Sequence, residues 1–331
     1  MHSSIRTLSR LTVVLLVVAV LFGCTVGCAP KSKETVVCAL DWTPNTNHTG
    51  MFLAKDRGYY DAEGIDIEFR ESDMNFIEMV ANGSATFGIA AQEQVMQARA
   101  SDAHMPIVAI AAMIRHNTSG FASPADRGIR RPKDFEGKTY SGWGTELELS
   151  ILRTLMEKDG GDYDRVRIVN QSANNYIASM ETEADFAWIF YGWDGIHCEY
   201  ESYPIDFILL QDIVPDLDFY SPVLITNEAT LEDNPELVRR FLRATAKGYH
   251  DAIADAEAGV DSLMAVVPEY DRALLLKSQT YLNPLYIDDA PYWGEMRRDV
   301  WEAFARWMDA NGLLDHPIDI DDCFTNDFLT K

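Results

Sequence analysis

The chain has 331 residues, of which 47% are hydrophobic and 24% are charged. This composition is too hydrophobic for a disordered protein, and the length suggests about two domains of roughly 100–200 residues each. Acidic residues outnumber basic residues by 52 to 28, which gives a formal net charge of −24. Such an acidic body repels nucleic-acid phosphates and anionic lipid surfaces, so nucleic-acid binding is excluded.

The N-terminus has the pattern of a secretory signal. A basic segment precedes the apolar residues 11–23, which are fewer than the roughly 20 needed to span a membrane. The string Leu21–Cys24 resembles a bacterial lipobox, in which Cys24 becomes lipidated after cleavage; Cys28 is the alternative, and an ordinary cleaved signal is the other interpretation. We expect a signal peptide over 1–23, a linker over 24–34 and a lipid-anchored extracytoplasmic protein.

Three further cysteines, Cys38, Cys198 and Cys323, are far apart in the sequence. They form no C-x-x-C pair, which excludes a zinc ribbon and a thioredoxin-type motif. One disulfide among them remains an option, but we expect buried free thiols.

Short apolar strands alternate with helices through the first two thirds of the chain, a pattern that predicts parallel sheets with helical crossovers. The expected strands cover 36–40, 65–69, 86–90, 106–114, 138–141, 166–169, 186–190 and 207–210. The expected helices among them cover 51–55, 75–81, 93–100, 146–158 and 175–181. The pattern restarts after Pro132–Asp134, so we expect two α/β units in tandem.

The C-terminal third is predicted to be helical. A long amphipathic helix runs from Pro235 to about Ala256, with Asn234 as its N-cap. Further helices are expected over 261–267, 272–281 and 292–311. Because no strand intervenes, we expect these helices to pack on an existing lobe.

Side chains suited to a small, flat, polar ring follow the predicted strands, where open α/β sheets bind their ligands. Aromatic faces stack on such a ring, and a carboxylate accepts the paired N–H donors of an aminopyrimidine. The candidates are Asp41, Trp42, Asn45, His48, Gln92, Glu93, Asn117, Trp143, Glu146, Tyr191, Trp193 and Asp194.

Each of these candidates also has a structural interpretation. Trp42 and Trp193 fit core positions beside turns, Asp41 fits a helix cap, and His48 fits a residue that orients its loop. The histidines are too scattered for metal-ligand spacing, so we expect no metal site. Gly142–Gly144 lacks the third glycine of a dinucleotide fingerprint, and no G-x-S-x-G or H-E-x-x-H motif occurs.

The string Leu40–Gly50 closely resembles the opening of the solute-binding proteins that deliver thiamine pyrimidine precursors to ABC transporters, the ThiY-like family. The resemblance covers nearly everything after residue 35. It continues through His116–Phe121, Phe135–Tyr140, Gly142–Gly144, Phe186–Trp193, Asp288–Pro291 and Trp293–Met296. The candidates inside these strings that carry over best are Trp42, Asn45, His48, Trp143, Tyr191 and Trp193.

This resemblance implies an α/β fold of the type II periplasmic-binding-protein class. Two lobes are joined by crossover strands near 119–125 and 219–225. Lobe 1 is expected to comprise 35–122 and 223–331, with the helical C-terminal third packed on it, and lobe 2 to comprise 123–222.

The resemblance also implies a function: an ABC importer component that binds a formylaminomethyl- or hydroxymethyl-aminopyrimidine between its lobes and docks a permease. We expect a monomer with no cofactor and no enzymatic activity. Trp42 and either Tyr191 or Trp193 would stack on the ring, and a carboxylate would pair with it. The amide partners would be Asn45, Gln92 and Asn117, and the carboxylate one of Asp41, Glu93, Glu146 and Asp194.

Four alternatives stay open. Other members of the family bind riboflavin or related heterocycles, and thiamine itself is a further candidate ligand. A sensor that signals without transport would have the same sequence features. A fungal relative makes the pyrimidine from its own histidine and pyridoxal phosphate, and an enzyme of that kind would use His48. That enzyme carries a cysteine-rich motif that this chain lacks. An extracytoplasmic enzyme that acts on the same heterocycle would use His48 with a neighbouring carboxylate.

Overall fold

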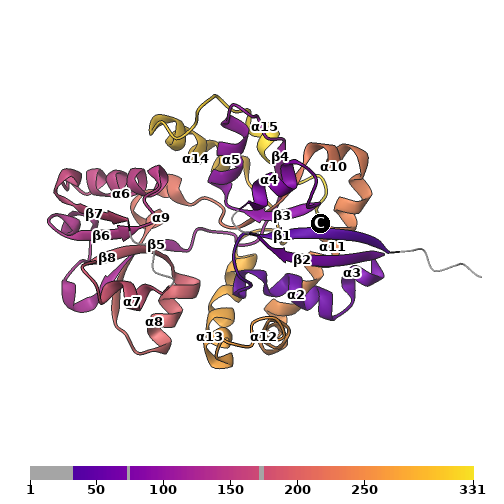
Figure 1. Cartoon of the computed structure of the whole chain (residues 1–331), viewed down its shortest axis with the longest axis horizontal. Coiled ribbons are helices and arrows are strands. Elements are labelled where there is room, and N and C mark those ends of the chain that lie inside the picture. Colours follow the sequence, from indigo (N-terminus) through magenta and orange to yellow (C-terminus); the bar gives the residue numbers. More distant parts are fainter. Residues whose placement is uncertain (1–32, 73–74, 171–174) are drawn as a thin grey trace, which may run out of the picture. The chain divides into compact units, whose positions relative to one another are not determined.

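The computed structural model describes residues 33–72, 75–170 and 175–331. The expected signal peptide, Cys24 and Cys28 lie outside the described residues. Two five-stranded sheets organise the described chain (Figure 1), with strand orders β2-β1-β3-β10-β4 and β7-β6-β8-β5-β9. The expected α/β class with two sheets is confirmed.

The first sheet contains the strands β1 (Glu34–Leu40), β2 (Ile65–Glu71), β3 (Phe87–Ala90), β4 (Ile107–Ala112) and β10 (Val223–Asn227). The second sheet contains the strands β5 (Ser119–Pro124), β6 (Thr139–Gly142), β7 (Arg167–Asn170), β8 (Phe186–Phe190) and β9 (Ile205–Leu209). Every strand predicted from an apolar run is present, within a few residues of its expected bounds.

The helices of the first two thirds are α2 (Thr49–Asp56), α3 (Tyr59–Ala62), α4 (Phe76–Ala81), α5 (Gln92–Ala100), α6 (Glu146–Lys158), α7 (Tyr176–Met180), α8 (Ile196–Tyr200) and α9 (Leu210–Ile213). The later helices are α10 (Glu228–Asp233), α11 (Pro235–Ala254), α12 (Ala256–Met264), α13 (Arg272–Leu282), α14 (Arg298–Ala310) and α15 (Ile320–Cys323). Two short turns also matter below: η1 (Thr46–His48) and the π-helix η5 (Tyr191–Gly195). Among the described helices, none has the length and apolarity needed to cross a membrane.

Both sheets are mixed, which corrects the expectation of parallel sheets. In the first sheet β10 runs antiparallel to β3 and β4, and in the second β5 runs antiparallel to β8 and β9. The reason is that the chain crosses between the sheets twice. After β4 of the first sheet it continues into β5 of the second sheet, and after β9 of the second sheet it returns to the first sheet as β10. All of β5 belongs to the second sheet, so the sheet pairing favours a division before Ser119. The lobe boundaries themselves stay a prediction.

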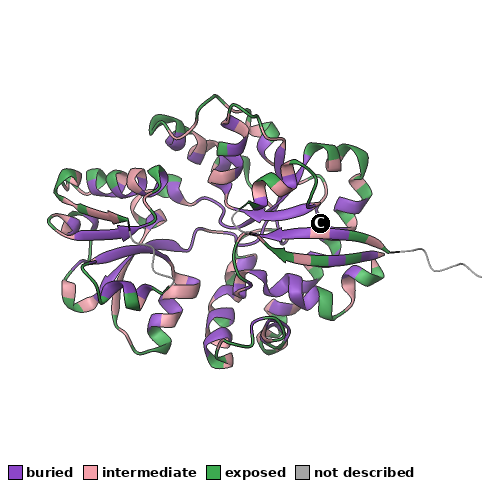
Figure 2. Cartoon of the chain, in the orientation of Figure 1, coloured by how far each residue is buried: buried purple, intermediate pink, exposed green. Residues whose placement is uncertain are grey.

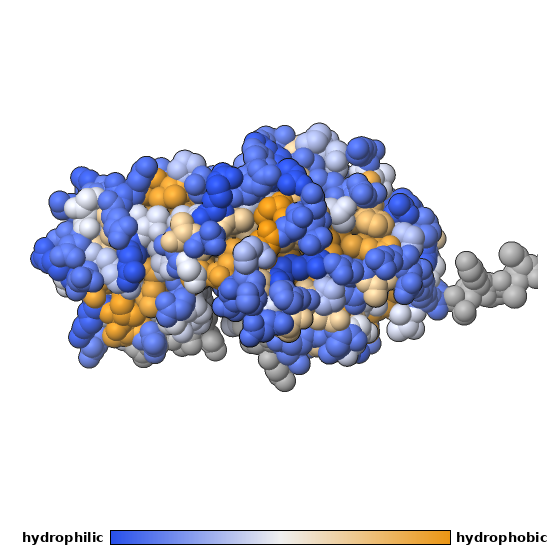
Figure 3. Space-filling view, turned by 90° about the horizontal axis from the view of Figure 1, so that it is seen from above, coloured by the Kyte–Doolittle hydropathy of each residue, from blue (hydrophilic) through white to orange (hydrophobic). Residues whose placement is uncertain are grey.

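Side chains of alternating strand residues fill different cores, as the twofold period of a strand requires. In β1, Cys38 and Leu40 join a cluster with Met51 of α2 and Phe241 of α11, whereas Ala39 joins the cluster on the other face. Figure 2 shows the result: the inner strands are buried, the edge strands β2 and β7 are partly exposed, and the helices expose their outer faces. The face seen in Figure 3 is mostly hydrophilic with scattered apolar patches, as the acidic composition suggests.

The helical C-terminal third packs on the first sheet, as expected. Phe241 of α11 stacks on Phe87 of β3, with ring centroids 3.9 Å apart. Asn234 occupies the N-cap position of α11, but its side chain makes no capping hydrogen bond. The helix ends at Ala254, before Asp255 caps α12 through the backbone N–H of Ala258 at 3.0 Å.

The helix expected over 292–311 begins six residues late, at Arg298. Gly294 has a φ of +90°, a backbone conformation that interrupts a helix. The preceding Trp293 is buried against Tyr249, with ring centroids 4.5 Å apart. Tertiary packing of this segment therefore overrides the amphipathic pattern.

The three described cysteines, Cys38, Cys198 and Cys323, are all free and buried. Burial raises the pKa of the Cys198 and Cys323 thiols to about 12 in each case. The thiols stay protonated and therefore unreactive, which agrees with the expectation of buried free cysteines.

Candidate ligand-binding site

The loop after β1 presents Trp42 on an internally hydrogen-bonded turn. The Asn45 side chain accepts from the backbone N–H of Asn47 (2.9 Å) and so caps η1. The backbone N–H of Asn45 donates to His48 Nδ1 (3.2 Å), so the imidazole proton lies on Nε2 and is donated to Asp41 Oδ1 at 3.0 Å. His48 has no exposed surface, whereas Trp42 is 53% exposed. Asn45 and His48 therefore build the loop that presents the indole.

The loop after β6 presents Trp143 in the same way, with 54% of the residue exposed. Its anchor is the buried carboxylate of Glu148, which accepts hydrogen bonds from Tyr140 Oη (2.6 Å) and from the backbone N–H of Trp143 (3.1 Å). The backbone N–H of Thr145 donates to the same carboxylate at 2.9 Å. Burial, together with the adjacent Glu148, raises the pKa of Tyr140, so its hydroxyl remains a donor.

Two polar groups at the start of α5 are buried without a partner. Gln92 Oε1 accepts from the backbone N–H of Tyr220 (2.9 Å), but Gln92 Nε2 and Glu93 Oε2 have no hydrogen-bond partner among the described residues. Burial raises the pKa of Glu93 to about 7, although its own backbone N–H opposes the shift. Burial likewise raises the pKa of Asp194 to about 6, against hydrogen bonds from the backbone of Phe190 and of Asp194 itself.

The aromatic residues after β8 pack against α13 and against the residues just before it. Tyr191 lies beside Tyr281 with ring centroids 5.3 Å apart, and Trp193 meets Tyr270 edge-to-face at 5.1 Å. The hydroxyl of Tyr191 donates to Glu199 Oε1 at 2.6 Å. Both side chains are half-buried by these contacts, so Trp42 and Trp143 are the more accessible indoles.

The other two candidates, Asn117 and Glu146, have neither an exposed aromatic ring nor an unpaired buried group. Asn117 is fully buried, its Oδ1 accepts from the backbone N–H of Ser119 (2.9 Å), and its Nδ2 donates to the carbonyl of Leu217 (2.8 Å). The amide of Asn117 is therefore engaged within the chain. Glu146 is exposed at the first position of α6.

A charged cluster joins the segments that connect the two sheets. The Arg115 guanidinium contacts Asp289 (2.7 Å) and Glu295 (2.8 Å), while His116 Nδ1 lies 2.6 Å from Asp218. The hydrogen bond to Asp218 raises the pKa of His116, although burial opposes this shift. These contacts tie residues 115–116 to the returning segment at 218 and to the C-terminal third.

Sequence reasoning missed the roles of Glu148 and Asp218. Thr145-x-x-Glu148 fits the capping-box pattern, so a local signal for Glu148 was present. Asp218 had no such signal, because its partner His116 is 102 positions earlier in the chain.

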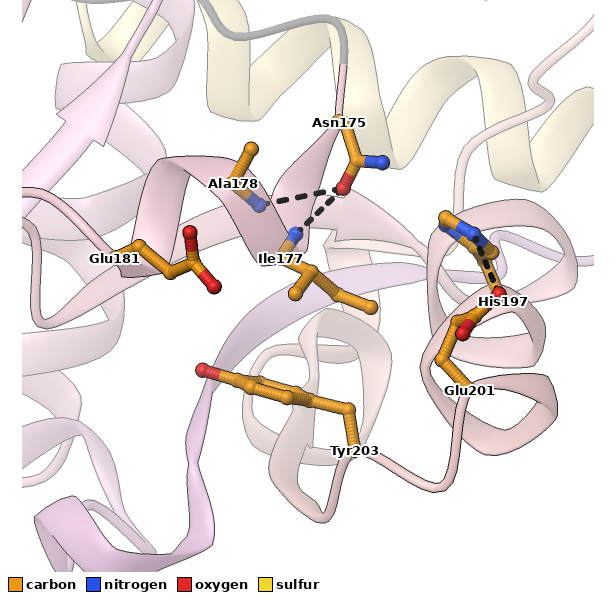
Figure 4. Close-up of a pocket in the computed structure, with 7 residues that line it drawn as sticks. All are labelled: Asn175, Ile177, Ala178, Glu181, His197, Glu201 and Tyr203. Carbon is orange, nitrogen blue, oxygen red and sulfur yellow. Dashed lines mark hydrogen bonds and ion pairs between the residues drawn. The ribbon is translucent and has the colours of Figure 1, made fainter.

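Two surface hollows lie elsewhere and contain none of the predicted site residues. The hollow in Figure 4, of about 400 Å³, is lined by Asn175, Ile177, Ala178, Glu181, His197, Glu201 and Tyr203. The other, of about 480 Å³, lies between α8 and α13 and is lined by Ile196, Glu199, Ala273, Leu276, Lys277, Thr280 and Tyr281. The described residues include no group of three His, Cys, Asp or Glu side chains placed to hold a metal ion.

A family model described as "NMT1/THI5 like" matches residues 45–258. The chain belongs to the NMT1/THI5-like family. Its relatives include proteins named for binding and proteins named for synthesis, so family membership alone leaves the activity open.

Two of these relatives are binding proteins by name. The formylaminopyrimidine-binding protein of Halalkalibacterium halodurans is 28% identical, over 95% of this chain and 98% of that protein. The riboflavin-binding protein RibY of Chloroflexus aurantiacus is 24% identical, over 91% and 88%. A third relative, 4-amino-5-hydroxymethyl-2-methylpyrimidine phosphate synthase of Legionella pneumophila, is 26% identical, over 90% and 93%.

Solved structures show the same fold at lower identity. The alkanesulfonate-binding protein SsuA from Xanthomonas axonopodis pv. citri, bound to MOPS, superimposes with a TM-score of 0.65 at 13% identity. The match covers 89% of this chain and 99% of that one. The fold is thus that of the periplasmic binding proteins, as the sequence resemblance implied.

Proposed function

We propose that this protein is the extracytoplasmic solute-binding component of an ABC importer and that it binds an aminopyrimidine precursor of thiamine. The Halalkalibacterium relative, which matches 95% of this chain, supports the ligand class by its name. The periplasmic-binding-protein fold supports capture outside the cytoplasm. The lipobox-like string at Leu21–Cys24 supports tethering to the membrane through Cys24.

The observation that carries the proposal is the pair of exposed indoles. Trp42 and Trp143 follow β1 and β6, one in each sheet, and are the two most exposed large hydrophobic side chains of the described residues. Exposed apolar groups at strand ends are typical of a ligand site in α/β proteins. We assign the stacking surfaces to these two residues, since Tyr191 packs against Tyr281 of α13 and Trp193 packs against Tyr270, just before that helix.

The unpaired groups of α5 supply the polar half of the site. Gln92 Nε2 is a buried donor and Glu93 Oε2 is a buried acceptor, and neither has a partner among the described residues. An aminopyrimidine edge offers the complementary pair, a ring nitrogen that accepts and an exocyclic amine that donates. A ligand that satisfies both groups removes the cost of leaving them buried and unpaired. Glu93 is therefore our choice among the four candidate carboxylates.

Calorimetry on the purified protein tests this function. We expect the formylaminomethyl- and hydroxymethyl-aminopyrimidines to bind more tightly than thiamine or riboflavin. Trp42→Ala and Trp143→Ala should each weaken binding by about 5- to 150-fold, because base–aromatic stacking of this kind is worth roughly 1–3 kcal/mol. Tyr200→Ala, which removes another exposed aromatic side chain, is the control. If riboflavin bound more tightly than the aminopyrimidines, riboflavin would become the proposed ligand. If no heterocycle bound, the proposal would be refuted.

The lipid anchor and the transport role need separate tests. Labelled palmitate should be incorporated into the wild-type protein and into Cys28→Ala but not into Cys24→Ala. Uptake of the aminopyrimidine by cells should require both this protein and a permease. If uptake continued without this protein, the transport role would be refuted and the sensor role would be favoured.

The synthase relatives favour one alternative, an enzyme that uses His48. His48 is fully buried, and both ring nitrogens are engaged by Asn45 and Asp41, which suits a structural role better. Formation of a pyrimidine product by the purified protein, abolished in His48→Ala, would establish the enzyme instead.

A further inference from the structure

The carboxylate of Glu148 gathers more hydrogen bonds than a helix cap requires. A capping box pairs only the N-cap residue with the third helical residue, here Thr145 and Glu148. Glu148 also accepts from Tyr140 Oη (2.6 Å) and from the backbone N–H of Trp143 (3.1 Å). Its two oxygens thus bind strand β6, the loop and helix α6 together.

This carboxylate is 1% exposed and forms no ion pair within the described residues. A buried anion without a cation is costly unless several donors satisfy it. Its donors among the described residues all lie between residues 140 and 145, so the stabilisation depends on this loop having one conformation. The N-terminal end of the 13-residue helix α6 adds a favourable field.

The neighbouring glycines fit the same arrangement. A Cβ on Gly142 would collide with Glu148 Oε1 and with the ring of Tyr140, so the carboxylate reaches the loop only past a glycine. Gly144 has a φ of +78°, which other residues rarely adopt. The large side chain that this loop exposes is Trp143.

We propose that Glu148 is a positioning residue that holds the Trp143 indole ready for a ligand. This inference rests on the proposed function, since it needs a planar ligand to stack on Trp143. A loop fixed before binding avoids the entropy cost of ordering the indole during binding. Glu148 itself need not touch the ligand.

Glu148→Gln tests the inference, with Glu157→Gln, an exposed residue of the same helix, as its matched control. Glutamine turns an N–H₂ group toward donors and so cannot satisfy them all. We expect the Kd for the aminopyrimidine to rise about 2- to 12-fold in Glu148→Gln, the cost of ordering one side chain on binding, and to be unchanged in Glu157→Gln. Tyr140→Phe removes a single donor to Glu148 and should therefore raise the Kd by a smaller factor. This variant provides the test if Glu148→Gln does not fold.

A double-mutant cycle separates positioning from general destabilisation. If Glu148 acts through the indole, Glu148→Gln should weaken binding little further once Trp143→Ala is present. An equal loss in both backgrounds would overturn the inference, because a merely structural role does not depend on Trp143.

A ligand-free measurement separates this inference from the proposed function. Fluorine NMR of protein labelled with 5-fluorotryptophan should show a sharp Trp143 signal, assigned through Trp143→Phe, that broadens or shifts in Glu148→Gln and not in Glu157→Gln. If the wild-type protein binds no heterocycle, the proposed function fails, and the fluorine spectra alone decide whether Glu148 orders Trp143. An unchanged signal together with an unchanged Kd overturns the inference and leaves the function intact.

Discussion

Glu93 and Glu148 occupy matching places in the two sheets but have opposite surroundings. Each lies in the first turn of the helix that follows a strand, Glu93 after β3 and Glu148 after β6. Glu148 is satisfied by donors from its own loop, whereas Glu93 Oε2 is buried without a partner among the described residues. The Glu148 carboxylate therefore stabilises the fold, whereas the Glu93 carboxylate can still accept a hydrogen bond from a ligand.

This difference shows how a binding protein divides its buried polar groups. A satisfied carboxylate stabilises the fold and fixes geometry. An unsatisfied one destabilises the unliganded protein, and the ligand recovers that free energy on binding. Replacing the two residues should therefore change stability in opposite directions.

Glu93→Gln should give the largest effect, a gain of about 3 kcal/mol in the free energy of unfolding at pH 8. The pKa of Glu93 is raised from its usual 4.5 to about 7, so the folded state binds a proton more readily than the unfolded state. Wild-type stability is therefore lost as pH rises from about 4.5 through 7, and the amide removes that loss. Urea unfolding at pH 5 and pH 8 measures the gain, which should shrink below about 1 kcal/mol at pH 5.

The same variant should bind the aminopyrimidine more weakly, since the acceptor that pairs with the amine is gone. Glu78→Gln, an exposed residue of α4, is the control and should change neither stability nor affinity. A Glu93→Gln protein that is less stable than the wild type at pH 8 would contradict the comparison.

Glu148→Gln should change the free energy of unfolding in the opposite direction, with a loss of about 2 kcal/mol. The reason is that an unsatisfied buried donor costs roughly 1–3 kcal/mol. Urea unfolding at pH 8, the condition used for Glu93→Gln, measures the loss. If Glu148→Gln were as stable as the wild type, the carboxylate would not be the anchor of this loop.

Gly144→Ala should cost about 2 kcal/mol by straining the same loop from the backbone side. A Cβ there would meet the Asn170 side chain at 2.7 Å, in addition to the strain of a φ of +78°. Gly137 has nearly the same φ, +75°, with no heavy atom within 4 Å of such a Cβ. Gly137→Ala should therefore cost only about 1 kcal/mol, and the difference between the two unfolding free energies isolates the contact.

The sequence predicted the strands well because each is a short apolar run between turn residues. It did not predict β5 (Ser119–Pro124) or β10 (Val223–Asn227) in this way. Serine, glycine and proline interrupt β5, and only the family resemblance indicated crossovers at these two places. The contacts of the candidate site residues were harder to predict. Tyr191 and Trp193 pack on Tyr281 and Tyr270, about eighty to ninety positions later in the chain, and no local pattern records such a contact.

Local polar groups were easier to find than their roles. Gln92 and Glu93 were candidates because they follow a strand, but their lack of partners depends on tertiary structure. Asn117 was a candidate for the same reason, and its amide bonds to Leu217, a hundred positions away. Spacing along the chain therefore predicts which residues reach a strand end, whereas packing decides which of them remain free for a ligand.

A third carboxylate, Asp218, extends the comparison because its main side-chain partner is titratable. His116 donates to Asp218, and Asp289 and Arg115 also face the imidazole. The hydrogen bond to Asp218 raises the pKa of His116, so its stabilising contribution is full below pH 6.5 and is lost as pH rises through the raised pKa. His116→Gln should therefore cost about 1 kcal/mol at pH 5.5 and less at pH 9, with exposed His250→Gln as the control. Urea unfolding measures both values; a cost that grows with pH would mean that the neutral imidazole, rather than the cation, holds the two connecting segments together.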